Sequence, residues 1–215
     1  MQAYLPILRR CTLFCSLTDV QILECLQTLR AKKRNFQKES VILAEGAPAD
    51  FFGIVLSGQV SVSKYDRFGN RNLFATLHPC ELFAESFAFS DASVMSVEVC
   101  AASECTVLLI KADNFYRCAA QCAPLLRNAL SAMANKNLAF DRRIEVVSKR
   151  RTRDKLLSFL SIQRQLQNSN TVRIEYSRQE LADYLGVDRS GLCSEIGKLA
   201  KQGVFSCSGK EFTLR

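Results

Sequence analysis

The feature that most constrains this chain is a long helical pattern running from Pro124 to about Lys149. Its apolar positions lie alternately four and three residues apart, which is the spacing of a helix packed along a partner helix. Proline suits the first turn of a helix, because its missing N–H would have no partner there. The one polar residue in this seam, Asn137, is of a type that fixes register in two-stranded pairs. The predicted dimer seam comprises Leu126, Leu130, Met133, Asn137, Phe140, Ile144 and Val147.

The same spacing also fits a helix that simply lies on its own domain. The flanking patterns favour the dimer, because strand signals precede the helix and helix signals follow it. A helix in that position connects two domains and can hold two copies of the chain together. We therefore expect a homodimer and a domain organisation of 1–123, 124–149 and 150–215.

Charge is concentrated in the last third of the chain. Residues 141–215 contain 15 Lys and Arg against 9 Asp and Glu, whereas the whole chain carries a net charge of +8. An excess of this kind favours an anionic partner such as DNA. No apolar run is long enough to cross a membrane, and the N-terminus does not have the pattern of a secretory signal. The sequence thus predicts a cytoplasmic protein with no membrane partner.

Between Phe36 and Ile110 the pattern changes to short apolar strands separated by turns. Turn glycines and a Gly69-Asn70 pair punctuate these strands, which is typical of an all-β barrel or sandwich. We expect Ile54, Leu56, Val60 and Val62 to face its interior. The preceding residues, 1–35, are expected to form short helices that end at the basic run 32–34.

The barrel region resembles a cyclic-nucleotide-binding domain. The resemblance rests on Glu45-Gly46, Leu56-Ser57-Gly58 and the segment His78-Pro79-Cys80-Glu81-Leu82-Phe83-Ala84-Glu85. In that family the last segment is a phosphate-binding cassette, with an Arg-Ser pair about ten residues later. The resemblance implies a jelly-roll barrel and an effector pocket formed by Cys80, Ala84, Glu85, Ser86, Met95 and Ser96.

The residues that bind a cyclic phosphate are changed in this chain. Glu85 and Ser96 match the family pattern, but Cys80 and Ala84 replace two glycines and Met95 replaces the arginine. Methionine cannot pair with a phosphate, so the effector is expected to be something other than cyclic AMP. Its identity does not follow from the sequence.

The segment after the basic run 149–155 predicts a helix-turn-helix. Ser177 and Glu180 form a capping box, Gly186 ends a first helix, and Asp188 can cap a second one from Arg189 to Gln202. Leu192, Ile196 and Leu199 mark the buried face of that helix, and residues 204–215 suggest a β-hairpin wing. The opposite face carries Arg189, Ser190, Ser194, Lys198 and Lys201.

Residues 177–190 are similar to the winged-helix DNA-binding domain of the cyclic-AMP receptor and fumarate–nitrate reductase regulator (Crp/Fnr) family. With the barrel and the long helix, the resemblance covers nearly the whole chain in the family's order. It implies Arg178 and Gln179 on DNA phosphates, with Ser177 beside them in the DNA-binding surface, and Arg189 with Ser190 at the base edges of a pseudo-palindromic operator. The predicted fold class is α+β. An activator of this type would also contact RNA polymerase.

Other functions are less well supported by the residues. The chain has a single histidine, no nucleotide-binding glycine loop and no metal-ligand cluster, which argues against an enzyme. The ten cysteines are expected to be thiols. A regulator that senses redox state through these thiols, an iron–sulfur cluster or a haem held by His78 and Cys80 remains an alternative. So does an effector-binding module that never touches DNA.

Overall fold

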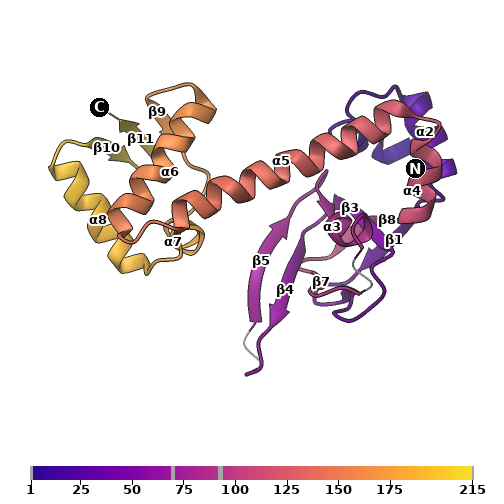
Figure 1. Ribbon diagram of the computed structural model, residues 1–215, viewed down its shortest axis with the longest axis horizontal. Helices are drawn as coiled ribbons and strands as arrows, with labels where there is room; N and C mark the ends of the chain where they lie inside the picture. The colour runs from indigo at the N-terminus through magenta and orange to yellow at the C-terminus, as the bar shows by residue number, and fades with distance from the viewer. Residues whose placement is uncertain (1, 69–70, 92–93, 215) are drawn as a thin grey trace. The chain divides into compact units, whose positions relative to one another are not determined.

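A computed structural model describes residues 2–68, 71–91 and 94–214, so the predicted Gly69-Asn70 turn lies outside it. The chain forms two compact units, Met1–Ala134 and Asn135–Arg215. The division falls inside α5 (Ala123–Val147), which Figure 1 shows as one continuous helix that contributes residues to both units.

The first unit contains the predicted barrel, a jelly roll of two antiparallel sheets with the strand orders β1-β8-β3-β6 and β2-β7-β4-β5. Val55, Val60, Val99 and Val107 fill the space between the sheets. The expectation that Ile54 and Leu56 face the barrel interior is wrong, because they are buried on the other side of β3, in the cluster that contains the helices. The strands are β1 (Lys32–Phe36), β2 (Val41–Leu43), β3 (Phe51–Ser57), β4 (Val60–Tyr65), β5 (Arg71–Leu77), β6 (Leu82–Phe83), β7 (Glu98–Ala101) and β8 (Cys105–Lys111).

Short helices pack beside the barrel, as the sequence predicts for its N-terminal part. They are η1 (Gln2–Tyr4), α1 (Leu5–Leu8), α2 (Asp19–Thr28), α3 (Glu85–Ala88) and α4 (Ala112–Ala119). The expectation that the basic run 32–34 ends a helix is wrong, because these residues lie in β1 and pair with β8. Their side chains are exposed, so tertiary pairing with β8 decides their conformation.

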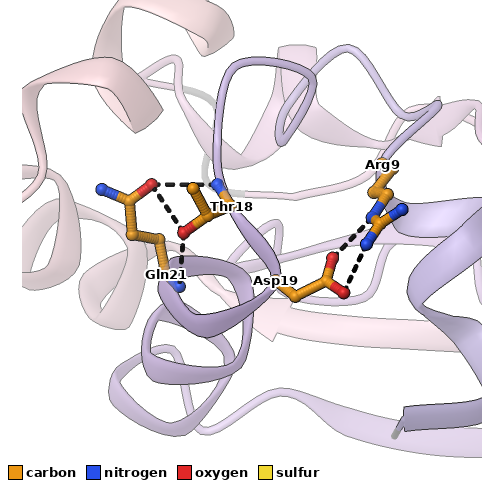
Figure 2. A network of polar contacts seen from close by, with 4 residues as sticks. All are labelled: Arg9, Thr18, Asp19 and Gln21. Atoms are coloured by element: carbon orange, nitrogen blue, oxygen red, sulfur yellow. Dashed lines mark hydrogen bonds and ion pairs between the residues drawn. The ribbon is translucent and has the colours of Figure 1, made fainter.

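The start of α2 is fixed by two local polar contacts, shown in Figure 2. Thr18 is the N-cap: its hydroxyl accepts from the Gln21 N–H, and the Gln21 side chain accepts from the Thr18 N–H at 2.9 Å. Beside this capping box, the Arg9 guanidinium binds the Asp19 carboxylate through two nitrogens. This hydrogen-bonded pair holds the pKa of Asp19 below its usual range. The contacts join the chain around α1 to the first turn of α2.

The helix α5 packs on the first unit through a face that the heptad spacing does not mark. Leu125 and Ala129 are buried there, and the Asn128 amide donates to the Leu13 carbonyl at 3.0 Å. At its other end, Val146 is fully buried in the second unit. The seam residues Leu130, Phe140 and Ile144 belong to neither buried face and are exposed in the single chain.

The second unit is a three-helix winged domain. Its elements are α6 (Thr152–Gln167), β9 (Thr171–Arg173), α7 (Arg178–Leu185), α8 (Arg189–Lys201), β10 (Phe205–Ser208) and β11 (Glu211–Leu214). Leu156, Leu181, Leu192 and Phe212 are fully buried in its core. The wing is the predicted hairpin, and β9 adds a third strand to it in the order β10-β11-β9. None of the helices described in either unit is long and apolar enough to span a membrane.

Candidate nucleic-acid interface and effector region

The first helix of the helix-turn-helix begins and ends as its sequence predicts. The Glu180 N–H donates to the Ser177 hydroxyl at 3.2 Å, and the Glu180 carboxylate accepts from the Ser177 N–H at 2.7 Å. That backbone hydrogen bond holds the pKa of Glu180 below its usual range. Gly186 ends α7 with φ +60°, a left-handed conformation that glycine adopts without a Cβ penalty. Lys155 also donates to the Leu185 carbonyl at 3.0 Å, a contact that no sequence pattern indicates.

The second helix, α8, is capped by Asp188. Its carboxylate accepts from the Gly191 N–H at 2.8 Å and from the Ser190 hydroxyl. The Ser190 hydrogen bond, followed by that of Gly191, holds the pKa of Asp188 below its usual range. The Ser190 hydroxyl is therefore occupied within the turn, and it would have to leave Asp188 to contact a base.

The outer face of α8 is exposed and basic, whereas its inner face is buried. Leu192 and Leu199 have no exposed surface, and Ile196 is 7% exposed. Lys198 forms an ion pair with Glu195 at 3.8 Å. The five residues of this helix that were predicted to face DNA are all exposed: Arg189, Ser190, Ser194, Lys198 and Lys201. Cys193, which the prediction does not include, is exposed as well.

Arg178, predicted to bind phosphate, holds the wing. Its guanidinium donates to the Gly209 carbonyl at 2.8 Å and to the Cys207 sulfur at 3.1 Å, and it lies 5.0 Å from the centre of the Phe212 ring. These contacts fix the hairpin turn against the start of α7. Gln179 is exposed and donates to Asp183 at 2.9 Å.

The predicted dimer seam is largely uncovered in the single chain. Leu130 is 60% exposed, Phe140 59% and Ile144 62%, and Asn137 is also exposed. Met133 is half-buried. Large apolar side chains at this spacing on a solvent-facing helix form a stripe that a partner helix could cover. Leu138, which is 50% exposed, lies outside the predicted seam.

The predicted effector region keeps the backbone of a glycine-bearing cassette. Cys80 has φ +82° and Ala84 has φ +60°, both in the left-handed region that favours glycine. Ala84 stands directly before α3, and the Cys80 thiol lies 3.4 Å from the Ile7 carbonyl. The chain thus adopts at both positions the conformation that glycine would allow, although both residues carry a side chain.

The six predicted pocket residues are not all brought together on one open surface. Met95 is 1% exposed and belongs to the barrel core with Ala49 and Val99, and Glu85 is 3% exposed. Ser86 and Ser96 are exposed. A groove of about 360 Å³ lies elsewhere on this unit, and its lining includes Arg30, Lys32, Lys111 and Arg117.

Histidine and cysteine are the side chains most suited to binding a transition metal. Within 2–68, 71–91 and 94–214, no group of three His, Cys, Asp or Glu residues is arranged to hold a metal ion. His78 is exposed, and its Nδ1 lies 3.6 Å from the Glu81 carboxylate.

Known proteins resemble this chain both in its barrel and over most of its length. Residues 33–122 match the family model of the cyclic nucleotide-binding domain. FixK2 from Bradyrhizobium japonicum is similar at 20% identity and a TM-score of 0.56, over 86% of this chain and 92% of that one. CLP, the c-di-GMP responsive global regulator of Xanthomonas campestris, is similar at 20% identity and a TM-score of 0.59, over 91% and 99%. The catabolite activator protein of Thermus thermophilus gives 18% identity and a TM-score of 0.53, over 95% and 93%. No curated protein sequence matches the chain.

Proposed function

We propose that this chain is a homodimeric transcription regulator that binds DNA in the cytoplasm. Its barrel matches the cyclic nucleotide-binding domain family, and its fold is that of the Crp/Fnr regulators. The observation that carries the proposal is the face of α8. It is capped at its N-terminus, buried on one side, and lined on the other by exposed Arg189, Lys198 and Lys201. A helix of this kind fits the major groove of DNA.

Two copies of α8 can read two half-sites. If the seam on α5 pairs two chains about a two-fold axis, the operator should be a pseudo-palindrome with half-sites about 34–36 Å apart. Exposed cations near the start of α6, Arg150 and Arg151, add to the positive surface that attracts phosphates. An activating member of such a family would also contact RNA polymerase.

The alternative is an effector-binding module that does not touch DNA. It would leave both the exposed cations of α8 and the basic character of the second unit without a role. Selection of bound sequences from random double-stranded DNA by the purified protein separates the two functions. Enrichment of a pseudo-palindrome supports the regulator, whereas the absence of any enriched sequence would remove it.

Arg189 is expected to read a base. With Arg189→Ala, affinity for the selected operator should fall about 10- to 100-fold, because a bidentate arginine–guanine contact provides roughly 1–3 kcal/mol of discrimination. Affinity for random DNA should be nearly unchanged. Fluorescence anisotropy with both DNAs measures the two effects in one salt series.

Lys201→Ala is the matched control on the same helix, because it removes a cation that we assign to a phosphate. It should weaken binding to operator and random DNA alike and lower the slope of log K against log salt by about 1. Equal losses on both DNAs for Arg189→Ala would show that Arg189 also binds phosphate and reads no base.

The effector of this regulator is proposed to be something other than cyclic AMP. Stripping water from a cyclic phosphate costs several kcal/mol unless a cation or well-aimed donors replace it. The position of the family's arginine is occupied by Met95, which is 1% exposed, and the Cys80 and Ala84 side chains occupy the glycine positions. Neutral donors replace only part of what a guanidinium provides.

Titration calorimetry with cyclic AMP and cyclic GMP should therefore detect no binding at micromolar concentration. A structurally similar protein of known response to either nucleotide serves as the positive control for the instrument and the ligands. Micromolar affinity for either nucleotide would mean that another cation of this chain supplies the missing charge, so that Met95 does not prevent nucleotide binding.

A further inference from the structure

A basic groove lies on the first unit, away from the predicted effector region. Its volume of about 360 Å³ is within the size range of pockets that hold small organic molecules. The side chains that line it come from β1, β3, β8 and α4 and from the residues that follow α2. We call it the cationic groove, after the four cations in its lining: Arg30, Lys32, Lys111 and Arg117.

Strand pairing fixes one wall of the cationic groove. Lys32 of β1 pairs with Leu109 of β8, and Phe51 of β3 pairs with Lys111 of β8. Paired residues of neighbouring strands project from the same face of a sheet, and so do residues two apart on one strand. This face therefore presents two cations beside two half-buried apolar side chains, those of Phe51 and Leu109.

The two arginines come from α4 and from the end of α2, which lie side by side in Figure 1. Arg30 follows α2 with φ +47°, a left-handed position that glycine usually occupies after a helix. The Asn114 amide of α4 donates to the Leu29 carbonyl, one residue before Arg30, at 3.1 Å. Arg117 stands three residues after Asn114 on α4. This hydrogen bond thus holds the two helices together where they carry the arginines.

The positive charges of the cationic groove are only partly compensated. Lys111 lies 3.5 Å from the Asp50 carboxylate and 3.9 Å from that of Asp113, which also lines the groove. In the part of the chain that the structure describes, the other three cations of the groove form no ion pair with a carboxylate. These cations repel one another, so an anion that carries more than one charge would be bound favourably between them.

We propose that the cationic groove binds a small organic molecule that carries a diphosphate group. A guanidinium presents a planar fork of donors that matches two phosphate oxygens, and Arg30 and Arg117 provide two such forks. Phe51 and Leu109 provide an apolar surface for the organic part. A hollow of this volume favours a small molecule over a protein partner, which would need a larger contact surface. Binding of such a molecule does not depend on the proposed function.

Titration calorimetry of the full chain in magnesium-free buffer tests this proposal with three probes. ADP carries both parts of the ligand, pyrophosphate carries the diphosphate alone, and adenosine carries an organic part alone. ADP should bind at one site per chain, pyrophosphate should bind more weakly and displace ADP, and adenosine should not bind. Because the contacts are between charges, the affinity for ADP should fall as the salt concentration rises.

Matched variants locate the bound ADP. Arg30→Gly and Arg117→Ala should each lower the affinity for ADP at least about 10-fold, because each removes charge-assisted hydrogen bonds. Glycine suits the left-handed backbone at position 30, so Arg30→Gly should melt at about the wild-type temperature or above it, which separates lost binding from lost folding. Lys38→Ala removes an exposed cation of the same unit outside the groove, and it should change the affinity by less than about 2-fold.

Several results would overturn the proposal. One is the absence of ADP binding at about 1 mM, and another is pyrophosphate binding as tightly as ADP, which would leave the organic part without a role. Losses for Lys38→Ala or Lys201→Ala equal to that for Arg117→Ala would mean that ADP is attracted by positive charge anywhere on the protein. Tighter binding of a glutamate-rich peptide than of ADP would mean that the groove docks an acidic protein segment. Each of these results leaves DNA binding, which is measured separately, untouched.

Discussion

The substitution Phe140→Asp is expected to convert the protein from a dimer to a monomer. It should also lower the affinity for an operator with two half-sites by about 10²- to 10⁴-fold. In the single chain Phe140 is 59% exposed, and in the proposed dimer it would face the partner helix. An aspartate there would carry its charge into an apolar seam, which costs several kcal/mol unless a cation compensates it. Truncation to alanine should also weaken the dimer by several kcal/mol if the ring is fully buried in it.

The effect on DNA follows from the loss of the second half-site. In a dimer, binding of one α8 places the other at a high effective concentration over its own half-site, which a monomer lacks. Analytical ultracentrifugation and anisotropy with operator DNA measure the two consequences separately.

Ala139→Asp is the matched control for this prediction. It adds the same carboxylate to the next residue of α5, at an exposed position outside the predicted seam. It should leave the protein dimeric and its operator affinity within about 3-fold of wild type, since exposed charges on a helix surface have small effects. A wild-type protein that sediments as a monomer at micromolar concentration would refute the seam.

Helix boundaries in this chain could be predicted from the sequence because they depend on neighbouring residues. Hydrogen bonds and backbone angles within a few residues define these boundaries, at the Ser177–Glu180 capping box, at Gly186 and at Asp188. Short apolar runs separated by turn residues likewise indicate the barrel strands. They do not show which face each residue occupies, because β3 is buried on both of its faces. These local patterns can be recognised in the sequence without knowing the tertiary contacts.

The remaining features depend on residues that are distant in sequence. The basic run 32–34 is a strand only because β8 pairs with it, and Arg178 holds the wing only because Gly209 and Phe212 lie beside it. The resemblance to a nucleotide cassette identified Met95 but could not show that its side chain is buried in the barrel core. Nor could spacing show that the Cys118 thiol lies 3.9 Å from the Cys25 backbone carbonyl, because the two residues are 93 positions apart in the chain.

The aromatic cluster of the second unit gives the largest expected effect on stability. Phe159 of α6 is 1% exposed, and its ring centre lies 5.3 Å from that of Tyr184 on α7 and 6.3 Å from that of Tyr176. Tyr176 and Tyr184 are stacked at 5.6 Å, and the Arg143 guanidinium lies 5.3 Å from the Tyr184 ring centre. The cluster thus joins the end of α5 to the first helix of the helix-turn-helix.

Phe159→Ala should lower the free energy of unfolding of this unit by about 3–5 kcal/mol, because the ring is lost from a fully packed site and a cavity remains. In a unit of this size each kcal/mol lowers the melting temperature by about 4–8 °C, so the shift should be at least about 12 °C. Differential scanning calorimetry should show it in the transition of the second unit, with little change in that of the first. Leu166→Ala, on the same helix but 53% exposed, should shift melting by less than about 3 °C.

A small shift for Phe159→Ala would mean that neighbouring side chains collapse into the cavity. Equal shifts in both transitions would mean that the two units unfold together, because α5 then transmits the loss from one to the other.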